Sequence, residues 1–146
     1  MRLVIPDVIT PTEAVGIAES VDYIDLGGDL FTGIIAKIRE YAPISIDPPS
    51  YGRVERRREG HPWHSDTGAN GHMAWCEYSA GILLTDPHSF TGGGFFFQSD
   101  PTEPVFHYCD LILWSSGPEN AHKVSSNSGG RISLIMFFGG SKNDNL

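Results

Sequence analysis

The spacing of apolar residues is helical only in the first third of the chain. Over 30–41 they recur every three or four positions, which predicts an amphipathic helix. These residues are Phe31, Ile34, Ile35 and Ile38. An earlier helix is predicted over 11–20, because Thr10 can cap its first turn and a proline and Glu13 follow. Prolines in the stretch 43–49 end the helical part of the chain.

After residue 50 the pattern becomes that of strands. Short runs of aromatic and branched residues alternate with clusters of glycine, proline, serine and asparagine, which is typical of a β-sandwich or barrel. Strands are predicted over 52–58, 62–65, 73–85, 93–98, 104–107, 110–114, 121–125 and 131–138. Two helices followed by these strands predict a mainly β fold of the α+β class, with a jelly-roll core and the helices against one face.

Length and composition place these elements in one globular unit. The 146 residues are 40% hydrophobic and 19% charged, which excludes a largely disordered chain. We expect a single domain over 1–146, with a helical part over 1–50 and a β core over 51–138.

Charge and cysteine content limit the partners and the compartment. Ten basic against 18 acidic residues give a formal net charge of −8, which disfavours nucleic acid and anionic membranes as partners. The first residues lack the features of a signal peptide, and no apolar run reaches the roughly 20 residues that span a bilayer. Cys76 and Cys109 form no CxxC motif. We expect a soluble cytoplasmic protein with both thiols free.

Two short segments carry the residue types of a metal site. Residues two apart in an extended strand point to the same side, so His64 and Asp66 can bind one ion. His122 follows a strand and a Gly-Pro turn further along the chain. Two imidazoles and one carboxylate form the facial triad of non-haem Fe(II) enzymes, which leaves coordination positions open. The same ligand set also suits the Zn²⁺ of a hydrolase.

A basic residue lies on the last apolar strand. Arg131 begins the run that continues to Phe138, and strand alternation puts Arg131 and Ser133 on one face. An arginine on a strand suited to burial needs an anionic partner, because an unpaired buried charge is very costly. A guanidinium binds a carboxylate through two parallel hydrogen bonds, and Ser133 can add a third. The pair predicts a carboxylate-binding site inside the barrel.

These residues, in this order, resemble the signature of Fe(II)- and 2-oxoglutarate-dependent dioxygenases. The signature is His64-x-Asp66, then His122, and Arg131 nine residues later. The flanking sequence is similar to that of the prolyl-4-hydroxylase-like branch, and the resemblance covers 51–138. The similar segments are the glycine turn and metal strand at 59–66, the central strand at 78–85, a "GGxLxF"-like stretch at 91–97, and a block at 109–114 followed by 122–124.

The resemblance implies a double-stranded β-helix core of the cupin-like type and a specific chemistry. It implies that His64, Asp66 and His122 bind Fe(II), while Arg131 and Ser133 bind the distal carboxylate of 2-oxoglutarate. O2 is the other cosubstrate, and ascorbate is an optional addition. The implied enzyme is a hydroxylase that couples oxidation of an unactivated C–H bond to conversion of 2-oxoglutarate into succinate and CO2. The implied substrate is a peptidyl residue such as proline, or a small amino-acid-like molecule.

The chain departs from this branch where a second 2-oxoglutarate contact is expected. The branch often carries a tyrosine before the glycine turn, whereas Arg56, Arg57 and Arg58 occupy that region here. Tyr78 and Tyr51 are the alternative candidates for this contact. The basic run over 53–58 is read as a solvated edge strand by default. A second hypothesis is that some of its arginines contact an acidic or phosphate-bearing substrate at the mouth of the site, with Arg56 and Arg58 as the residues whose neutralisation would test it.

Two other function classes fit parts of the pattern. One is a catalytically silent metal-binding barrel that acts as a binding module, and the other is the zinc hydrolase. The pair Arg131 and Ser133 argues against the hydrolase, which has no need of a carboxylate clamp beside its last ligand. The other histidines are read as surface or core residues; they are His61, His72, His88 and His107. Substrate specificity is assigned to loops near 43–51, 66–72 and 86–91.

Overall fold

The computed structural model describes residues 1–19, 29–42, 46, 51–66, 73, 75–105 and 107–139. Within them the chain forms two α-helices, α1 (Pro11–Ala18) and α2 (Asp29–Tyr41), followed mainly by strands. The start of α1 is the predicted capping box: the Glu13 amide donates to Thr10 Oγ1 at 3.1 Å, and the Thr10 amide donates to Glu13 Oε1 at 2.9 Å.

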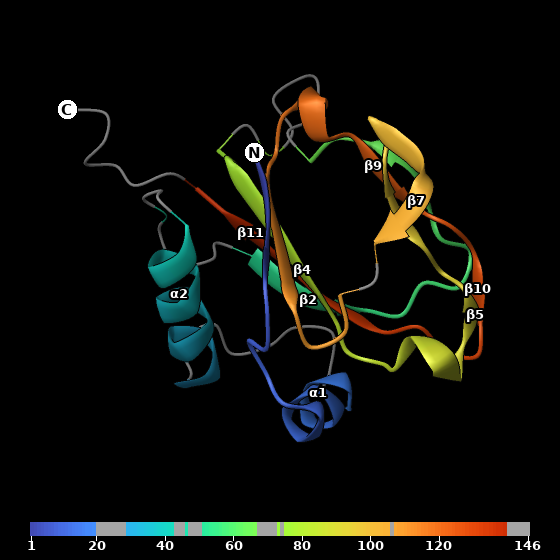
Figure 1. Cartoon of the computed structure of the whole chain (residues 1–146), viewed down its shortest axis with the longest axis horizontal. Coiled ribbons are helices and arrows are strands. Elements are labelled where there is room, and N and C mark those ends of the chain that lie inside the picture. The colour runs from blue at the N-terminus through green and yellow to red at the C-terminus, as the bar shows by residue number, and fades with distance from the viewer. Residues whose placement is uncertain are drawn as a thin grey trace.

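The strands form two main antiparallel sheets that curve toward each other (Figure 1). The larger sheet has the order β1-β8-β4-β11-β2, and the smaller has the order β3-β9-β6-β7. A short pair, β5 with β10, joins them at one end. The bounds in the larger sheet are β1 Arg2–Ile5, β2 Tyr51–Glu55, β4 Tyr78–Leu83, β8 Leu111–Ser115 and β11 Ser133–Phe138. The others are β3 His61–His64, β5 Thr91–Gly92, β6 Phe95–Phe97, β7 Asp100–Val105, β9 His122–Val124 and β10 Asn127–Ser128.

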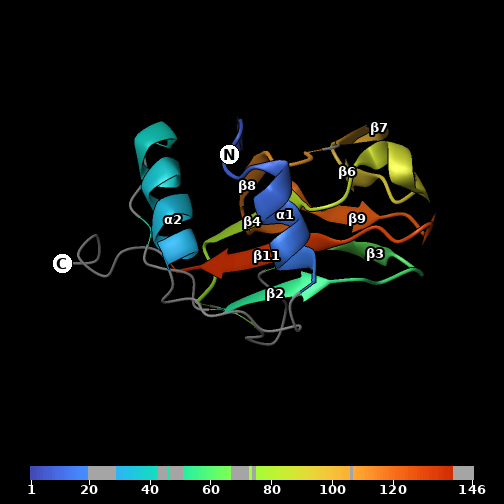
Figure 2. The same cartoon turned by 90° about the horizontal axis from the view of Figure 1, so that it is seen from below.

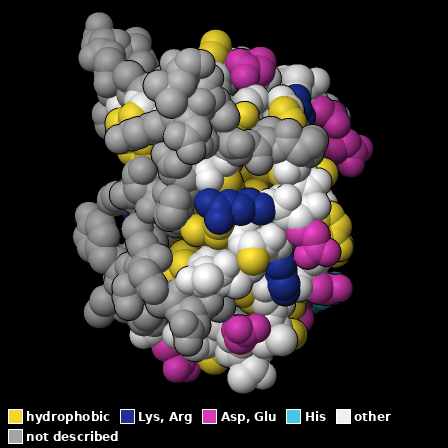
Figure 3. Space-filling model, turned by 90° about the vertical axis from the view of Figure 1, so that its left-hand side faces the viewer, with side chains coloured by type: hydrophobic (Ala, Val, Ile, Leu, Met, Phe, Trp, Pro, Cys, Tyr) yellow, Lys and Arg dark blue, Asp and Glu magenta, His cyan; other side chains and the backbone are white. Residues whose placement is uncertain are grey.

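Both helices cover the outer face of the larger sheet, away from the smaller sheet (Figures 1 and 2). Alternate residues of each central strand face them, such as Ala80 and Ile82 of β4 and Leu134 and Met136 of β11, and all four are fully buried. The main apolar core therefore lies between the larger sheet and the two helices. On the outside, the described part of the helix-covered side carries interspersed acidic and basic side chains (Figure 3).

The inner face of the larger sheet carries a second, aromatic core. Strand alternation sends Ile112 and Trp114 of β8 inward, where they pack with Phe95 and Phe97 of β6. The cavity described below lies between the two sheets, beside this cluster. The mainly β, jelly-roll fold predicted from the sequence is confirmed.

The structure differs from the predicted elements mainly at the ends of strands and at the edge strand β1 of the larger sheet. The predicted strands over 52–58 and 73–85 are shorter, as β2 and β4. The strand β1 was not predicted, because it has four residues at a sheet edge and only Ile5 is buried, so its alternation is too short to read. Cys76 and Cys109 are buried free thiols. Among the described residues, no helix has the length and apolarity needed to cross a bilayer.

Candidate active site

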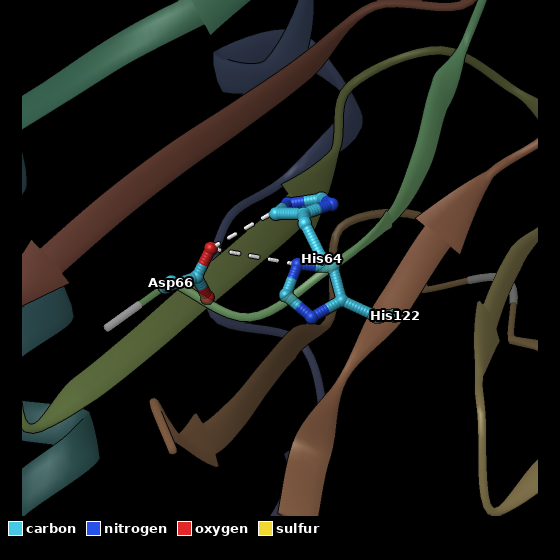
Figure 4. A group of neighbouring side chains, drawn as sticks. All are labelled: His64, Asp66 and His122. Carbon is cyan, nitrogen blue, oxygen red and sulfur yellow. Dashed lines mark ion pairs between the residues drawn. The ribbon is translucent and has the colours of Figure 1, made fainter. Parts of the chain in front are cut away.

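Three side chains converge between the ends of two neighbouring strands (Figure 4). His64 ends β3 and His122 begins β9, and the two residues are direct partners in the antiparallel pair. Asp66 follows His64 by two positions, and its Oδ1 lies 3.7 Å from His64 Nε2 and 3.5 Å from His122 Nε2. The potential ligand atoms all lie within 4.8 Å of one another. The predicted convergence of these residues is therefore seen in the structure.

Backbone carbonyls orient both imidazoles. His64 Nδ1 lies 2.8 Å from the Pro62 carbonyl, and His122 Nδ1 lies 2.9 Å from the Asn120 carbonyl. A carbonyl only accepts, so each Nδ1 carries the proton and donates. Each Nε2 then keeps its lone pair and faces Asp66. Burial lowers the pKa of both histidines below the ordinary value, which keeps them neutral, as metal ligation requires.

A hydrogen bond from Trp114 holds the Asp66 carboxylate in its orientation. The indole Nε1 donates to Asp66 Oδ2 at 2.9 Å in a buried hydrogen bond, so Oδ1 is left for an ion. The Phe95 ring stacks on His122, with ring centroids 5.1 Å apart and planes 25° apart. The donor set, two nitrogens and one oxygen held on one side, fits a borderline divalent ion such as Fe(II) or Zn²⁺.

A buried guanidinium lies in the same cavity. Arg131 is 8% exposed, and its Nη1 donates to Ser133 Oγ at 3.4 Å. Its Nε has no hydrogen-bond partner. In the described part of the chain, no carboxylate lies within 4.0 Å of Arg131. The Glu55 carboxylate acts on Arg131 only from beyond 4.0 Å, and it is already paired with Arg53 at 3.0 Å. Burying a guanidinium with so distant a counter-charge is costly, so the geometry fits an anion that enters from outside the chain.

One cavity of about 710 Å³ joins the metal-ligand cluster to Arg131. Its wall includes His64, Asp66 and His122 together with Arg131 and Ser133. Aromatic and apolar side chains of both sheets complete the lining, among them Phe95, Trp114, Ile135 and Phe137. The cavity can therefore hold an ion and an anionic organic molecule side by side.

No protein-family model matches the chain, and no curated protein matches it. In structure it is similar to a prolyl-4-hydroxylase of Pseudomonas putida, at 16% identity and a TM-score of 0.69, over 96% of this chain and 92% of that one. It is also similar to a truncated viral collagen prolyl hydroxylase of Paramecium bursaria Chlorella virus-1, at 15% identity and a TM-score of 0.69, over 97% and 90%. The fold is that of these oxygenases.

A third match has a higher identity over a smaller part of the other chain. It is a 2OG-Fe(II) oxygenase family protein from Burkholderia pseudomallei, at 21% identity and a TM-score of 0.55, over 78% of this chain. The chain spans about half of that protein, 54% of its length. The likeness predicted from the motifs is thus confirmed at the level of the fold.

Tyr78 does not join the cavity. It lies on the helix-facing side of β4, packed against the main core, and is absent from the cavity wall. The neighbouring positions Ser79 and Gly81 lie on the opposite face of β4, toward the smaller sheet, because successive residues of a strand alternate between its two faces. The geometry therefore gives no support to Tyr78 as a cosubstrate contact. The side chain of Tyr51, the other candidate, lies outside the described residues.

The basic run divides between two faces of the sheet. Arg53 and Arg57 line the cavity, whereas Arg56 points to the helices and donates to the Ala18 carbonyl at 2.6 Å. Arg58 is exposed. The hypothesis that some of these arginines contact substrate stays a prediction, and Arg53 and Arg57, rather than Arg56 and Arg58, are the ones that line the cavity.

The remaining predictions concern histidines and loops. His61 and His107 line the cavity, His88 is exposed, and His72 lies outside the described residues. The interpretation of His107 as a core residue did not foresee its place in the cavity wall. The predicted specificity loops 43–51 and 66–72 lie largely outside the described part of the chain, and 86–91 includes a 3₁₀ turn at Pro87–Ser89.

Removing the Trp114 hydrogen bond should weaken metal binding. Trp114→Phe keeps a smaller aromatic ring but removes the N–H that donates to Asp66 Oδ2. We therefore expect the affinity for Fe(II) or Mn²⁺ to fall about 10–100-fold. Calorimetric titration under anaerobic conditions measures this affinity. Trp63→Phe is the control, because Trp63 is 37% exposed and lies under Lys123. Equal affinities in the two variants would contradict the role given to Trp114.

A glycine leaves space for the Arg131 side chain. Gly93 has a φ of +68°, and a Cβ there would lie 2.6 Å from Arg131 Cδ. Gly93→Ala should lower the free energy of unfolding by roughly 1–2 kcal/mol through backbone strain, and should also displace Arg131 and so weaken binding of 2-oxoglutarate, the cosubstrate expected from the sequence. Gly130→Ala is the control, since Gly130 has a φ of +91° with no atom within 4 Å of the added Cβ.

Denaturant unfolding and calorimetric titration together test this prediction. Both variants should be destabilised, but only Gly93→Ala should bind 2-oxoglutarate less tightly. Unchanged 2-oxoglutarate affinity in Gly93→Ala would show that Arg131 is not displaced, or that it does not bind the cosubstrate.

Proposed function

We propose that this protein is an Fe(II)- and 2-oxoglutarate-dependent dioxygenase that hydroxylates an unactivated C–H bond. The observation that carries the proposal is the buried Arg131, without a carboxylate partner among the described residues, in the same cavity as His64, Asp66 and His122. A metal site alone would not need this cation. The structural similarity to prolyl hydroxylases and a 2OG-Fe(II) oxygenase family protein supports the same conclusion.

In this proposal, two groups of cavity residues have different tasks: one group holds the metal ion and the other binds the cosubstrate. His64, Asp66 and His122 would hold Fe(II) through Nε2, Oδ1 and Nε2, and all three side chains line the cavity. When bound, the ion with 2-oxoglutarate and O2 supplies the oxidising chemistry, which yields succinate and CO2 and transfers one oxygen atom to the substrate.

Arg131 and Ser133 bind the distal carboxylate of 2-oxoglutarate and so aim its oxo-acid end at the ion. The rings of Phe95 and Trp114 shield this side of the cavity from water. Trp114 also prevents the Asp66 carboxylate from turning, through its hydrogen bond to Oδ2.

For the substrate we propose a peptidyl residue, with proline as the first candidate, or a small amino-acid-like molecule. One structural neighbour, a prolyl hydroxylase from Trichoplax adhaerens, is described in complex with a peptide fragment of a hypoxia inducible factor; it is 14% identical, with a TM-score of 0.63 over 99% of this chain. The half-buried residues Arg53, Glu55 and Arg57 line the cavity, which supports a role for them in contacts with such a substrate.

Succinate formation tests the reaction without knowledge of the substrate. The protein is incubated with 2-oxoglutarate, O2 and added Fe(II), and slow uncoupled release of succinate is expected. Peptides and free amino acids are then screened for a mass increase of one oxygen atom. Metal binding without 2-oxoglutarate binding or succinate would instead indicate a silent binding module, and Zn²⁺-dependent hydrolysis would indicate a hydrolase.

A further inference from the structure

Asn120 is a buried polar residue that supports His122 without lining the cavity. It is 3% exposed, and its carbonyl is the atom that accepts from His122 Nδ1 at 2.9 Å. Its side-chain Nδ2 donates to the Ser115 carbonyl at 2.9 Å and to the Met1 carbonyl at 3.2 Å. Its Oδ1 accepts from Arg2 Nε at 2.8 Å. These bonds hold in place the residue whose carbonyl orients a proposed metal ligand.

Arg2 connects the larger sheet to the smaller sheet. It lies on β1, at the edge of the larger sheet, and is the direct partner of Trp114 in β8. Its Nη2 donates to Ser99 Oγ in the turn after β6, and its guanidinium carbon lies 4.1 Å from the centre of the Phe97 ring. Phe97 is the direct partner of His122 in the pairing of β6 with β9. Arg2 therefore bridges the two sheets beside the metal-ligand cluster.

The contacts of Arg2 lead to the supports of two proposed metal ligands. Asn120 orients His122. Trp114, the strand partner of Arg2, donates to Asp66 Oδ2. Arg2 is exposed, and replacing an exposed side chain usually has little effect. Here, however, three parts of one guanidinium have separate partners, namely Nε, Nη2 and the planar face. This arrangement uses the planar fork of arginine and indicates a specific role.

We propose that Arg2 is a positioning residue of the metal centre and acts through Asn120. The Arg2 side chain, held on the Phe97 ring, keeps the Asn120 carbonyl aimed at His122 Nδ1. The Nε2 of this imidazole is then turned toward Asp66, where the ion would bind. The inference rests on the proposed function only in taking His122 as a metal ligand, and it is independent of the cosubstrate.

Arg2→Met tests the proposal, because it removes the guanidinium from an exposed position and keeps a long side chain on β1. Anaerobic calorimetric titration measures the affinity for Fe(II) and Mn²⁺. Loss of a partner in direct contact with a ligand costs about 10–100-fold, and Arg2 is one contact further out, so we expect affinity to fall about 3–10-fold. Arg39→Met is the matched control. Arg39 also joins two segments, through a hydrogen bond from Nη2 to the Ile46 carbonyl at 3.1 Å, but it lies on helix α2. This variant should bind both ions as the wild type does.

A double variant tests whether Arg2 acts through Asn120. Asn120→Ala leaves the carbonyl in the chain but removes all the side-chain bonds that hold it, so ion affinity should fall about 10-fold or more. Adding Arg2→Met to Asn120→Ala should cost no further affinity, because the contact that links the two residues is already lost. Additive losses would show that Arg2 affects the ion by another route, and would overturn the inference.

Exchange of the His122 Nδ1 proton with water gives a readout that needs no ion and also covers the case in which Asn120→Ala does not fold. In proton NMR of the metal-free protein, this buried hydrogen bond should exchange slowly in the wild type and in Arg39→Met, and faster in Arg2→Met. Either wild-type ion affinity or wild-type exchange in Arg2→Met overturns the inference alone. Equal losses in Arg39→Met also overturn it, because they indicate a general effect on stability. A wild type that binds no ion overturns both proposals.

Discussion

His122→Ala should abolish stable Fe(II) binding and, with it, succinate formation from 2-oxoglutarate. The imidazole would supply one of the three ligand atoms that the described residues bring together, and its Nε2 faces Asp66 Oδ1 at 3.5 Å. Loss of a direct ligand should exceed the roughly 10–100-fold cost of changing an outer partner such as Trp114, so affinity should fall by more than about 100-fold. Anaerobic titration with Fe(II) and a succinate assay measure the two effects.

The control for His122→Ala is His88→Ala, a histidine removed from an exposed turn. It should bind Fe(II) and form succinate at the wild-type rate. Circular dichroism should show the same strand content in both variants, because His122 packs beside the aromatic cluster of Phe95 and Trp114 and not within the main apolar core. Wild-type succinate formation by His122→Ala would exclude it as a metal ligand and would remove the basis of the proposed reaction.

Arg131→Leu should change ligand binding and stability in opposite directions. Loss of the guanidinium should weaken 2-oxoglutarate binding by about 2–5 kcal/mol, which is roughly 30-fold or more. The ligand-free protein should unfold at the same or a higher denaturant concentration, because a buried charge without a carboxylate partner in the described chain is replaced by an apolar side chain. Metal affinity should stay at the wild-type value.

Calorimetry and denaturant unfolding measure the two effects of Arg131→Leu on the same sample. Arg131→Lys is the matched variant: it keeps the charge but loses the planar fork, so its affinity for 2-oxoglutarate should fall between those of the other two proteins. Unchanged 2-oxoglutarate affinity in Arg131→Leu would remove Arg131 from the site. A large loss of stability would show instead that Arg131 has a structural role.

Local patterns predicted well those features that depend on residues close in sequence. The capping box of α1 needs only Thr10 and Glu13, and it forms as expected. The convergence of His64 and Asp66 was predicted from strand alternation and is observed, although β3 ends at His64 and Asp66 lies in the bend that follows. The presence of His122 beside them depended on a resemblance to known enzymes, since nothing local specifies the pairing of β3 with β9.

The placement of Tyr78 and His107 could not be predicted in the same way. The run Ile82-Leu83-Leu84 is apolar at every position, so its pattern does not reveal which face of β4 is the cavity side and which side Tyr78 takes. The environment of His107 is made by Gly81, Phe95 and Arg131, which come from other strands or loops. Only the three-dimensional arrangement shows that its Nδ1 is left unsatisfied.

The hydrogen bond from Trp114 to Asp66 has a practical consequence for work in solution. The indole touches a proposed ligand through Nε1 and has its ring centroid 5.0 Å from that of His122. Its fluorescence therefore originates beside the proposed metal site, where a bound paramagnetic ion would quench the emission. Trp63 and Trp75 also emit, so the part of the quenching that Trp114→Phe removes would report ion occupancy, without any label attached to the protein.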